Sequence, residues 1–336
     1  MAPSSSSTRP KLTHVARLAG VGMGTASRAL SGVGHVRKET LARVRTAAES
    51  LGYYPNEIAR SLRVRQSHVV AIVVPDIGSP FMIGCIRAMQ RVLREHRYMS
   101  VLIITDGDSA TEKEEIEYLI QRQIDGFLVV PADSSAPHFV SPKLASKPVV
   151  FFDQPLGDEN AGAVLVKNRQ AAYTAVRHLI EHGHKRIACI GVDRHLYSIC
   201  ERMQGYRDAM NEAALPECLA VPGPEAIDTQ VDEWLHMENP PTAIFSLSEL
   251  SSIKVVEALA VRGVRMPGQI AFIGFDEVPF ADSLDTPLTV VAQPATTIGE
   301  QAALTLLERI EAGNALPGKQ VLLDAILVRR SSCGCR

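Results

Sequence analysis

The sequence predicts two different folds in one chain: an all-α helix-turn-helix head, and an α/β body of two lobes whose parallel sheets carry helices on both faces. Up to about residue 65, apolar residues recur at helical spacing and no strand pattern occurs. From residue 68, short apolar runs typical of buried strands alternate with helical segments. Charged residues are unevenly distributed, and the division falls at the same place. Residues 1–65 hold 11 basic and 3 acidic side chains, whereas the chain as a whole has a net charge of −2. A basic head on an acidic body favours a polyanionic partner such as nucleic acid.

Composition limits the class of protein. The 336 residues suffice for two or three domains, and a 46% hydrophobic content supports folded cores. No run of 18 apolar residues predicts a membrane span, and the serine-rich residues 1–10 predict a disordered tail rather than an export signal. We therefore expect a cytoplasmic protein with free thiols and no membrane partner. Cys333 and Cys335 are close together but lack the paired clusters of a zinc motif, so no metal site is expected.

Three short helices are expected in the head, residues 11–55. Gly20 ends the first helix, residues 25–30 form the second, and residues 38–51 form the third, with Gly52 as its C-terminal cap. Short helices joined by a tight, glycine-containing turn are typical of a helix-turn-helix. The apolar stripe of the first helix consists of Leu12, Val15, Ala16, Leu18 and Ala19.

The second helix is the candidate DNA-reading element, since its N-terminal residues enter the major groove in such a motif. The guanidinium of Arg28 could bond guanine O6 and N7 together, and Thr25 and Ser27 suit phosphate oxygens. The simpler alternative for Arg28 is an ordinary surface arginine. Glycines 20, 22 and 24 also resemble a dinucleotide-binding loop, but a helical segment precedes them where that loop needs a strand. The residues expected to face outward are Met23, Gly24, Ser27 and Arg28.

Nine strands are expected in the body, which suits two lobes rather than one. Ligands of parallel sheets bind beyond the carboxyl ends of the strands. The expected strands are 69–74, 101–104, 126–130, 149–152, 163–166, 187–190, 243–245, 270–275 and 289–292, separated by helices such as 81–96, 111–123, 169–182 and 248–261.

A series of motifs follows in order along the chain. VARLAGV (15–21), ESLGYYPNEIARSLR (49–63), VVPDIGSPF (73–81), QIDGFLVVP (123–131), LIEHGHKRIACIG (179–191), ERMQGY (201–206), PTAIF (241–245), IAFIGFDEVPFAD (270–282) and PLTVVAQP (287–294) are the principal ones. Together they resemble the LacI/GalR family of transcriptional regulators, the lactose-repressor type, from residue 11 onward. The resemblance implies a homodimer that binds a pseudo-palindromic double-stranded DNA operator, with one head per half-site.

The resemblance also implies DNA contacts outside the second helix. Residues 56–67 would form a hinge helix and linker, in which Leu62 wedges into a minor-groove base step; the alternative is that Leu62 packs on its neighbour. Gly22 and Gly24 depart from the family's polar residues, and each weakens a helix by about 1 kcal/mol if it lies inside one, which leaves more of the readout to DNA shape. The remaining implied DNA-binding residues are Leu12, His35, Tyr53, Asn56 and Ala59.

Residues 68–336 would bind a small sugar-like effector between two lobes, with no other cofactor. Lobe one would comprise about 68–167 plus 296–325, and lobe two about 168–293 plus the C-terminal end. Arg202 and Asp276 could hold vicinal hydroxyls by charged hydrogen bonds, or form a structural ion pair. Lys167 stands where the family often has aspartate, which favours an anionic effector such as a sugar acid. The full implied set is Asp76, Phe81, Met82, Asp153, Lys167, Ser198, Arg202, Ser248 and Asp276.

Effector binding would change the angle between the lobes and so alter operator affinity, with reciprocal linkage between the two ligands. Two other classes of protein fit the sequence less well. A periplasmic sugar-binding protein needs an export signal and has no use for a basic head, and an enzyme needs a catalytic constellation that the sequence does not display. His182 and His184 are interpreted as residues at a helix end, capped by Gly183, rather than metal ligands.

Overall fold

The computed structural model describes residues 10–31, 35–53, 66–157, 162–279 and 281–335. Contacts between residues divide the chain into two units, Met1–Ser67 and His68–Arg336, here called the head and the body. The sequence-predicted DNA contacts Asn56, Ala59 and Leu62, with most of the hinge, lie outside the described residues.

The head consists of three helices, α1 (Leu12–Leu18), α2 (Met23–Ser31) and α3 (Lys38–Ser50). Gly20 adopts a φ of +63° between α1 and α2, a left-handed conformation that glycine adopts without steric cost. The core is built mostly from small side chains, which let the helices approach closely: Val15, Ala16, Ala19, Ala26, Ala29, Val44, Ala47 and Ala48.

Two details of the head differ from the expectation. The second helix begins at Met23 instead of residue 25, because the Gly22 carbonyl already accepts hydrogen bonds from the amides of Thr25 and Ala26 at 2.9 and 3.0 Å. Gly24 therefore lies inside the helix, and Gly22 lies before it. Leu18 was expected in the buried stripe but is 59% exposed, since it lies at the edge of the face that Val15 and Ala19 bury.

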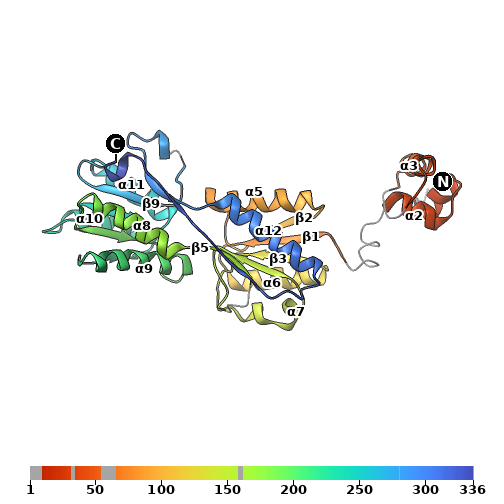
Figure 1. Ribbon diagram of the computed structural model, residues 1–336, viewed down its shortest axis with the longest axis horizontal. Helices are drawn as coiled ribbons and strands as arrows, with labels where there is room; N and C mark the ends of the chain where they lie inside the picture. The colour runs from red at the N-terminus through yellow and green to blue at the C-terminus, as the bar shows by residue number, and fades with distance from the viewer. Residues whose placement is uncertain (1–9, 32–34, 54–65, 158–161, 280, 336) are drawn as a thin grey trace, which may run out of the picture. The chain divides into compact units, whose positions relative to one another are not determined.

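The body contains two lobes, each built on a six-stranded sheet (Figure 1). In lobe one all strands are parallel, in the order β11-β5-β4-β3-β1-β2. The strands are β1 (Val69–Val74), β2 (Met99–Ile104), β3 (Gly126–Val129), β4 (Val149–Phe152), β5 (Ala163–Val166) and β11 (Gln320–Leu323). The helices are α5 (Pro80–Glu95), α6 (Ser109–Gln121), α7 (Pro142–Ala145) and α12 (Ala295–Glu311), with the short 3-10 helix η1 (Pro137–Val140).

Lobe two repeats this plan with the order β12-β10-β9-β8-β6-β7, except that β12 runs antiparallel to β10. The strands are β6 (Ile187–Ile190), β7 (Cys218–Ala220), β8 (Ala243–Ser246), β9 (Ala271–Phe275), β10 (Thr289–Ala292) and β12 (Ile326–Val328). The helices are α8 (Asn168–Glu181), α9 (Tyr197–Glu212), α10 (Ile227–Leu235) and α11 (Glu249–Val261), with the 3-10 helices η2 (Pro224–Ala226), η3 (Ala281–Ser283) and η4 (Ser331–Cys333).

Hydrophobic clusters lie on both faces of each sheet. In lobe one, α5 and α12 cover one face, and residues of α6 and α7 pack on the other. In lobe two, α8 and α9 cover one face, and α10 and α11 the other. The chain passes between the lobes three times: from β5 to α8, from β10 to α12, and from β11 to β12. Because of these crossovers, polar residues at the ends of one lobe's strands lie next to the other lobe.

Candidate DNA-binding surface and effector site

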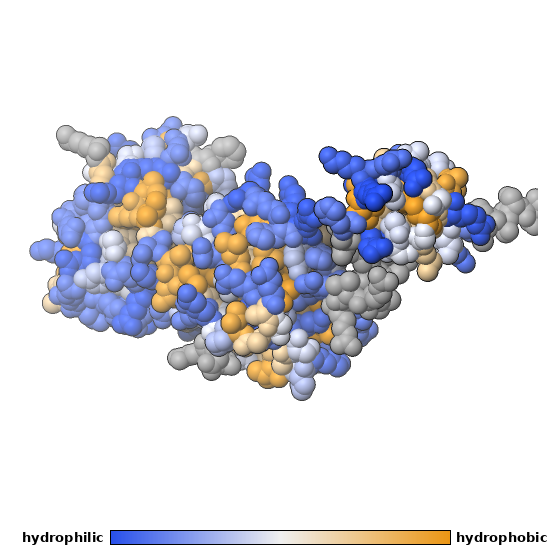
Figure 2. Space-filling view, turned by 45° about the vertical axis from the view of Figure 1, so that its right-hand side comes forward, coloured by the Kyte–Doolittle hydropathy of each residue, from blue (hydrophilic) through white to orange (hydrophobic). Residues whose placement is uncertain are grey.

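The outer face of α2 has the features of a groove-reading surface. Met23 is 57% exposed, and Gly24 and Arg28 are exposed as well, as the outward face requires. Thr25 and Ser27 are half-buried, and His35, just beyond α2, is exposed. A Cβ added at Gly24 would meet no atom within 4 Å, so a DNA backbone or base edge could approach α2 closely there. Hydrophilic and hydrophobic side chains share the visible surface of the head (Figure 2).

Basic side chains dominate the described surface of the head. Arg17 belongs to α1 and Arg28 to α2. Each such charge would strengthen the binding of a polyanion, and this contribution falls as the salt concentration rises. Two other expected contact residues, Leu12 and Tyr53, are half-buried against the head core, so they can present only part of their surface to DNA. The further exposed cations are Lys11, Arg37, Lys38, Arg43 and Arg45.

In the body, Arg202 on α9 is the centre of a polar cluster. Its side chain is 3% exposed, and the central carbon of its guanidinium lies over the Phe275 ring, 3.6 Å from the ring centroid. Arg202 Nε donates to Asn168 Oδ1 at 2.8 Å, and Nη1 donates to the Leu247 carbonyl at 2.8 Å. Nη1 also lies 3.6 Å from Asp276 Oδ2. A buried cation held in this way presents a fixed hydrogen-bonding edge.

Two aspartates that follow strands face this cation. Asp276, after β9, accepts a hydrogen bond from Gln293 Nε2 at 2.7 Å. Asp153, after β4, interacts electrostatically with both Arg202 and Asp276. Burial raises the pKa of both carboxyls, and the Arg202 guanidinium opposes that shift. Asp153 belongs to lobe one and Asp276 to lobe two, so charges from both lobes meet here.

A direct hydrogen bond connects the lobes beside this cluster. Gln154, 4% exposed, donates from Nε2 to Ser198 Oγ at 2.8 Å, and Ser198 is itself 4% exposed in the first turn of α9. Gln154 Nε2 also donates to Asp153 Oδ2 at 3.2 Å. The sequence motifs indicated Ser198, but not its partner on lobe one.

Glu249 and Gln293 are further members of the cluster, which the sequence motifs did not assign. Each has a buried side-chain oxygen, Glu249 Oε2 and Gln293 Oε1, with no hydrogen-bond partner among the described residues. Burial and the nearby Asp276 and Asp76 raise the pKa of Glu249 to about 7. Unsatisfied buried acceptors cost free energy, so their convergence at one place points to a ligand that donates hydrogen bonds.

The other expected lobe-one residues lie where α5 begins. Asp76 is exposed and accepts from the Gly78 amide at 2.8 Å, and Ser79 caps α5 by accepting from the Met82 amide at 3.1 Å. Met82 is 5% exposed and belongs to the lobe-one core, against which Phe81 packs in part. Of these side chains, Asp76 and Phe81 therefore retain surface for a ligand.

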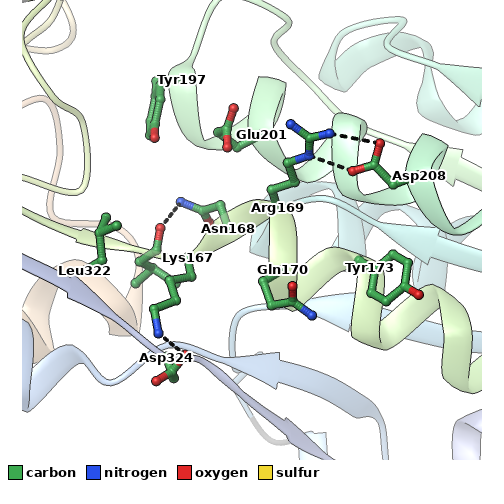
Figure 3. A pocket seen from close by; sticks show the side chains of 11 residues that line it. Lys167, Asn168, Arg169, Gln170, Tyr173, Tyr197, Glu201, Asp208, Leu322 and Asp324 are labelled. Carbon is green, nitrogen blue, oxygen red and sulfur yellow. Dashed lines mark hydrogen bonds and ion pairs between the residues drawn. The ribbon is translucent and has the colours of Figure 1, made fainter.

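Lys167 and Ser248 are engaged in other contacts. Lys167 Nζ lies 2.9 Å from Asp324 Oδ1 at the crossover between the lobes, with side chains 43% and 75% exposed (Figure 3). Ser248 caps α11, where its Oγ accepts from the Ser251 amide at 3.3 Å. The Lys167 charge is thus matched by an acid rather than directed at Asp153 and Asp276.

An open depression of about 600 Å³ adjoins the crossover, and two ion pairs lie in its lining (Figure 3). Arg169 Nε donates to Asp208 Oδ2 at 2.6 Å, and Lys167 pairs with Asp324. We regard the cluster around Arg202 as the stronger effector site, because its buried acceptors lack partners. The depression is lined by Val166, Lys167, Asn168, Arg169, Gln170, Tyr173, Tyr197, Glu201, Asp208, Leu322 and Asp324.

Comparisons with known proteins match both units. Residues 11–56 match the bacterial regulatory proteins of the lacI family, and residues 176–333 match a periplasmic binding protein-like domain. The chain is 33% identical to the HTH-type transcriptional regulator CelR of Thermobifida fusca, over 96% of this chain and 98% of that protein. It is 30% identical to the HTH-type transcriptional repressor CytR of Escherichia coli (strain K12), over 97% and 96%.

Solved structures agree. The complex of the transcriptional regulator CelR with cellobiose has a TM-score of 0.71 at 29% identity and covers 96% of this chain and 100% of that one. The lac repressor dimer bound to operator and the anti-inducer ONPF has a TM-score of 0.85 at 21% identity, covering 97% and 99%, and shows the same fold. Among the described residues, no helix is both long and apolar enough to cross a bilayer.

Proposed function

This chain belongs to the lacI family of bacterial regulatory proteins, and on that premise we propose that it is a repressor whose operator affinity is controlled by a neutral, hydroxyl-rich small molecule bound around Arg202. Family membership makes it a DNA-binding transcriptional regulator rather than an enzyme, which confirms those two expectations from the sequence.

The observation that supports a neutral polyol is the pair of buried acceptors without partners, Glu249 Oε2 and Gln293 Oε1. A sugar hydroxyl donates to such an oxygen and also accepts from a guanidinium, so one ligand can satisfy both kinds of group. Arg202 and Asp276 offer the charged donor and acceptor that suit adjacent hydroxyls. The similar regulator CelR has been solved in complex with cellobiose, a neutral sugar.

The charge of the cluster weighs against an anionic effector. Asp76, Asp153, Asp276 and Glu249 interact with one another near the cation Arg202, and burial already raises the pKa of three of these acids. A further negative charge would add to this repulsion. The sugar-acid hypothesis depended on Lys167, whose ammonium is paired with Asp324, so its main support is lost.

The two lobes provide the two-state element of the proposed switch. The Gln154–Ser198 hydrogen bond and the Lys167–Asp324 ion pair both join residues at or across the lobe boundary, so a change in lobe angle would strain or break them. An effector that binds one lobe angle more tightly shifts the population toward it, by no more than its difference in affinity for the two states. We propose that this angle sets the spacing of the two heads in a homodimer on a pseudo-palindromic operator.

At the DNA, we propose that Arg28 and Met23 reach base edges in the major groove while the surrounding lysines and arginines neutralise phosphates. The prediction that Leu62 wedges into a base step, with Asn56 and Ala59 beside it, remains part of this proposal.

Isothermal titration calorimetry with neutral and anionic sugars tests the effector class. Cellobiose, ribose and glucose form the neutral arm, and gluconate, glucuronate and ribose 5-phosphate form the anionic arm. We expect binding only in the neutral arm, and we expect Asp276→Asn to weaken it. The matched control is Asp208→Asn, which changes an acid on the same helix as Arg202 that pairs instead with Arg169. Tight binding of an anionic sugar with no neutral one bound would refute the proposed effector class.

A further inference from the structure

Near the C-terminal end of the described residues, Cys335 lies against two histidines of lobe two, and Cys333 precedes it by two positions. Cys335 Sγ lies 3.3 Å from His178 Nε2 and 3.4 Å from His182 Nε2. One ligand atom each from His178, Cys333 and Cys335 lies within 4.8 Å of the others. His182 lies outside this group, since its nitrogens are not within 4.8 Å of all three ligand atoms. We propose that His178, Cys333 and Cys335, with the His182 ring turned inward as the fourth ligand, form a tetrahedral zinc site that fastens the C-terminal segment to α8.

The distances suit that geometry. Zinc bonds of roughly 2.3 Å to sulfur and 2.0–2.1 Å to nitrogen, arranged tetrahedrally, separate neighbouring sulfur and nitrogen ligands by about 3.5 Å. The Cys335–His178 and Cys335–His182 separations fall close to this value. Two thiolates and two imidazoles in a tetrahedron are the ligand set typical of structural zinc.

The local structure positions the proposed zinc ligands close to one another. His178 and His182 are four residues apart near the end of α8, so they share a helix face, and their ring centroids are 4.3 Å apart. Gly334 adopts a φ of +91° between the two cysteines, which turns the chain tightly after the 3-10 helix η4. The ligands thus come from a rigid helix and a tight turn rather than from a long loop.

Groups beyond the ligands support metal binding. His182 Nδ1 lies 2.9 Å from the His178 carbonyl, so the proton on Nδ1 faces an acceptor and Nε2 keeps its lone pair for a metal. The Thr289 hydroxyl lies 3.1 Å from Cys333 Sγ and can stabilise a thiolate. Arg329 interacts electrostatically with His178 and Cys335 and would offset thiolate charge.

The site is half enclosed, as an exchangeable structural metal requires. Cys333 is fully buried and His178 is 8% exposed, while His182 is exposed and Cys335 is half-buried. An open depression of about 400 Å³ lined in part by His178 gives an ion a route from solvent. The close cysteine pair alone lacked a zinc motif, because its partners precede Cys335 by 157 and 153 residues.

Cobalt titration of the full-length reduced protein, after chelator treatment, tests the proposal. We expect a single equivalent of Co²⁺ to produce the visible bands of tetrahedral cobalt with thiolate charge transfer, and Zn²⁺ to displace it. Cys335→Ser and His182→Gln, which change the more exposed ligands, should weaken Zn²⁺ binding by more than about 100-fold, since changes outside the ligand shell already cost roughly 10- to 100-fold. The matched controls Cys200→Ser and His184→Gln should bind Zn²⁺ as the wild type does.

A thermal-denaturation scan provides a second readout, in which chelation lowers the Tm of the wild type and leaves that of Cys335→Ser unchanged. Absence of tetrahedral cobalt bands in the fully reduced wild type would overturn the proposal, and so would metal binding that survives Cys335→Ser. A Cys333–Cys335 disulfide in protein isolated without air, detected by mass spectrometry after alkylation, would replace the zinc site with a redox pair and overturn it as well.

Discussion

Substitution of Arg202 by methionine should destabilise lobe two strongly, although methionine keeps the apolar stem and much of the volume. The guanidinium donates to Asn168 Oδ1 and to the Leu247 carbonyl, both at 2.8 Å, and lies 3.6 Å from the Phe275 ring centroid. Arg202→Met removes the donor from both acceptors. The loss takes place out of contact with solvent, since Arg202 is only 3% exposed.

The magnitude follows from these losses. Each orphaned buried acceptor costs about 1–3 kcal/mol, and the lost cation–π contact costs about 1 kcal/mol more. Asp276 loses its cation but keeps Gln293 and can take up a proton, because burial already raises its pKa. These losses sum to about 3–7 kcal/mol. Since Asp276 can relieve its lost pairing by taking up a proton, we expect the lower part of that range, a loss of about 3–5 kcal/mol in the free energy of unfolding, which is usual for removing one partner of a buried ion pair.

Urea denaturation followed by tryptophan fluorescence measures this directly, because the single tryptophan, Trp234, is buried in lobe two. In an Asp276→Asn background, Arg202→Met should lower the free energy of unfolding by less, since no buried acid is left without its cation. The difference between the two backgrounds should be roughly 0.5–3 kcal/mol, the coupling energy usual for residues in contact. A loss below about 1 kcal/mol, which is the average for an arbitrary substitution, together with additive effects in the double variant, would refute the reasoning.

Three further outcomes are expected. Gly205→Ala places a Cβ 2.1 Å from a carbonyl oxygen of α8, so thermal denaturation should show that the body loses about 3 kcal/mol or more of stability. Gly24→Ala, where an added Cβ meets no atom within 4 Å, should instead stabilise the head by about 1 kcal/mol. Burial raises the pKa of Glu112 from 4.5 to about 7, so the folded state holds its proton more tightly and stability falls as pH rises across that interval. The wild type should lose about 3 kcal/mol relative to Glu112→Gln, and a pH-independent difference would contradict this. Lys167→Met removes an exposed ion pair with Asp324, so it should cost less than about 1 kcal/mol and leave effector affinity intact in a calorimetric titration.

The sequence predicted the interior of the fold better than its edges. Strands such as β1 and β9 are continuous apolar runs, because a central parallel strand is buried on both faces. The missed strands are β7, β11 and β12, which are only three or four residues long and half-exposed at or next to the sheet edges. Edge strands carry a mixed pattern because one side meets solvent, so their periodicity is weak.

The candidate sites show the same limit. Arg202 and Asp276 were assigned from motifs, and the structure brings them within 3.6 Å of each other. The Gln154–Ser198 contact joins residues 44 positions apart, and periodicity carries no information about such pairs. Lys167 was assigned to the effector site from its position in the motif order. Its ion-pair partner Asp324, 157 residues later, could only be found once β11 was placed.

The head side chain Arg28 offers the most direct test that this chain reads DNA through α2. Selection from a randomised duplex library, followed by fluorescence anisotropy on the enriched sequence, should yield a pseudo-palindrome whose binding falls about tenfold or more in Arg28→Ala, since a bidentate base contact is worth roughly 1–3 kcal/mol. Binding to that sequence should also weaken steeply with salt. Failure to enrich any sequence at low ionic strength, with and without the effector, would contradict the account.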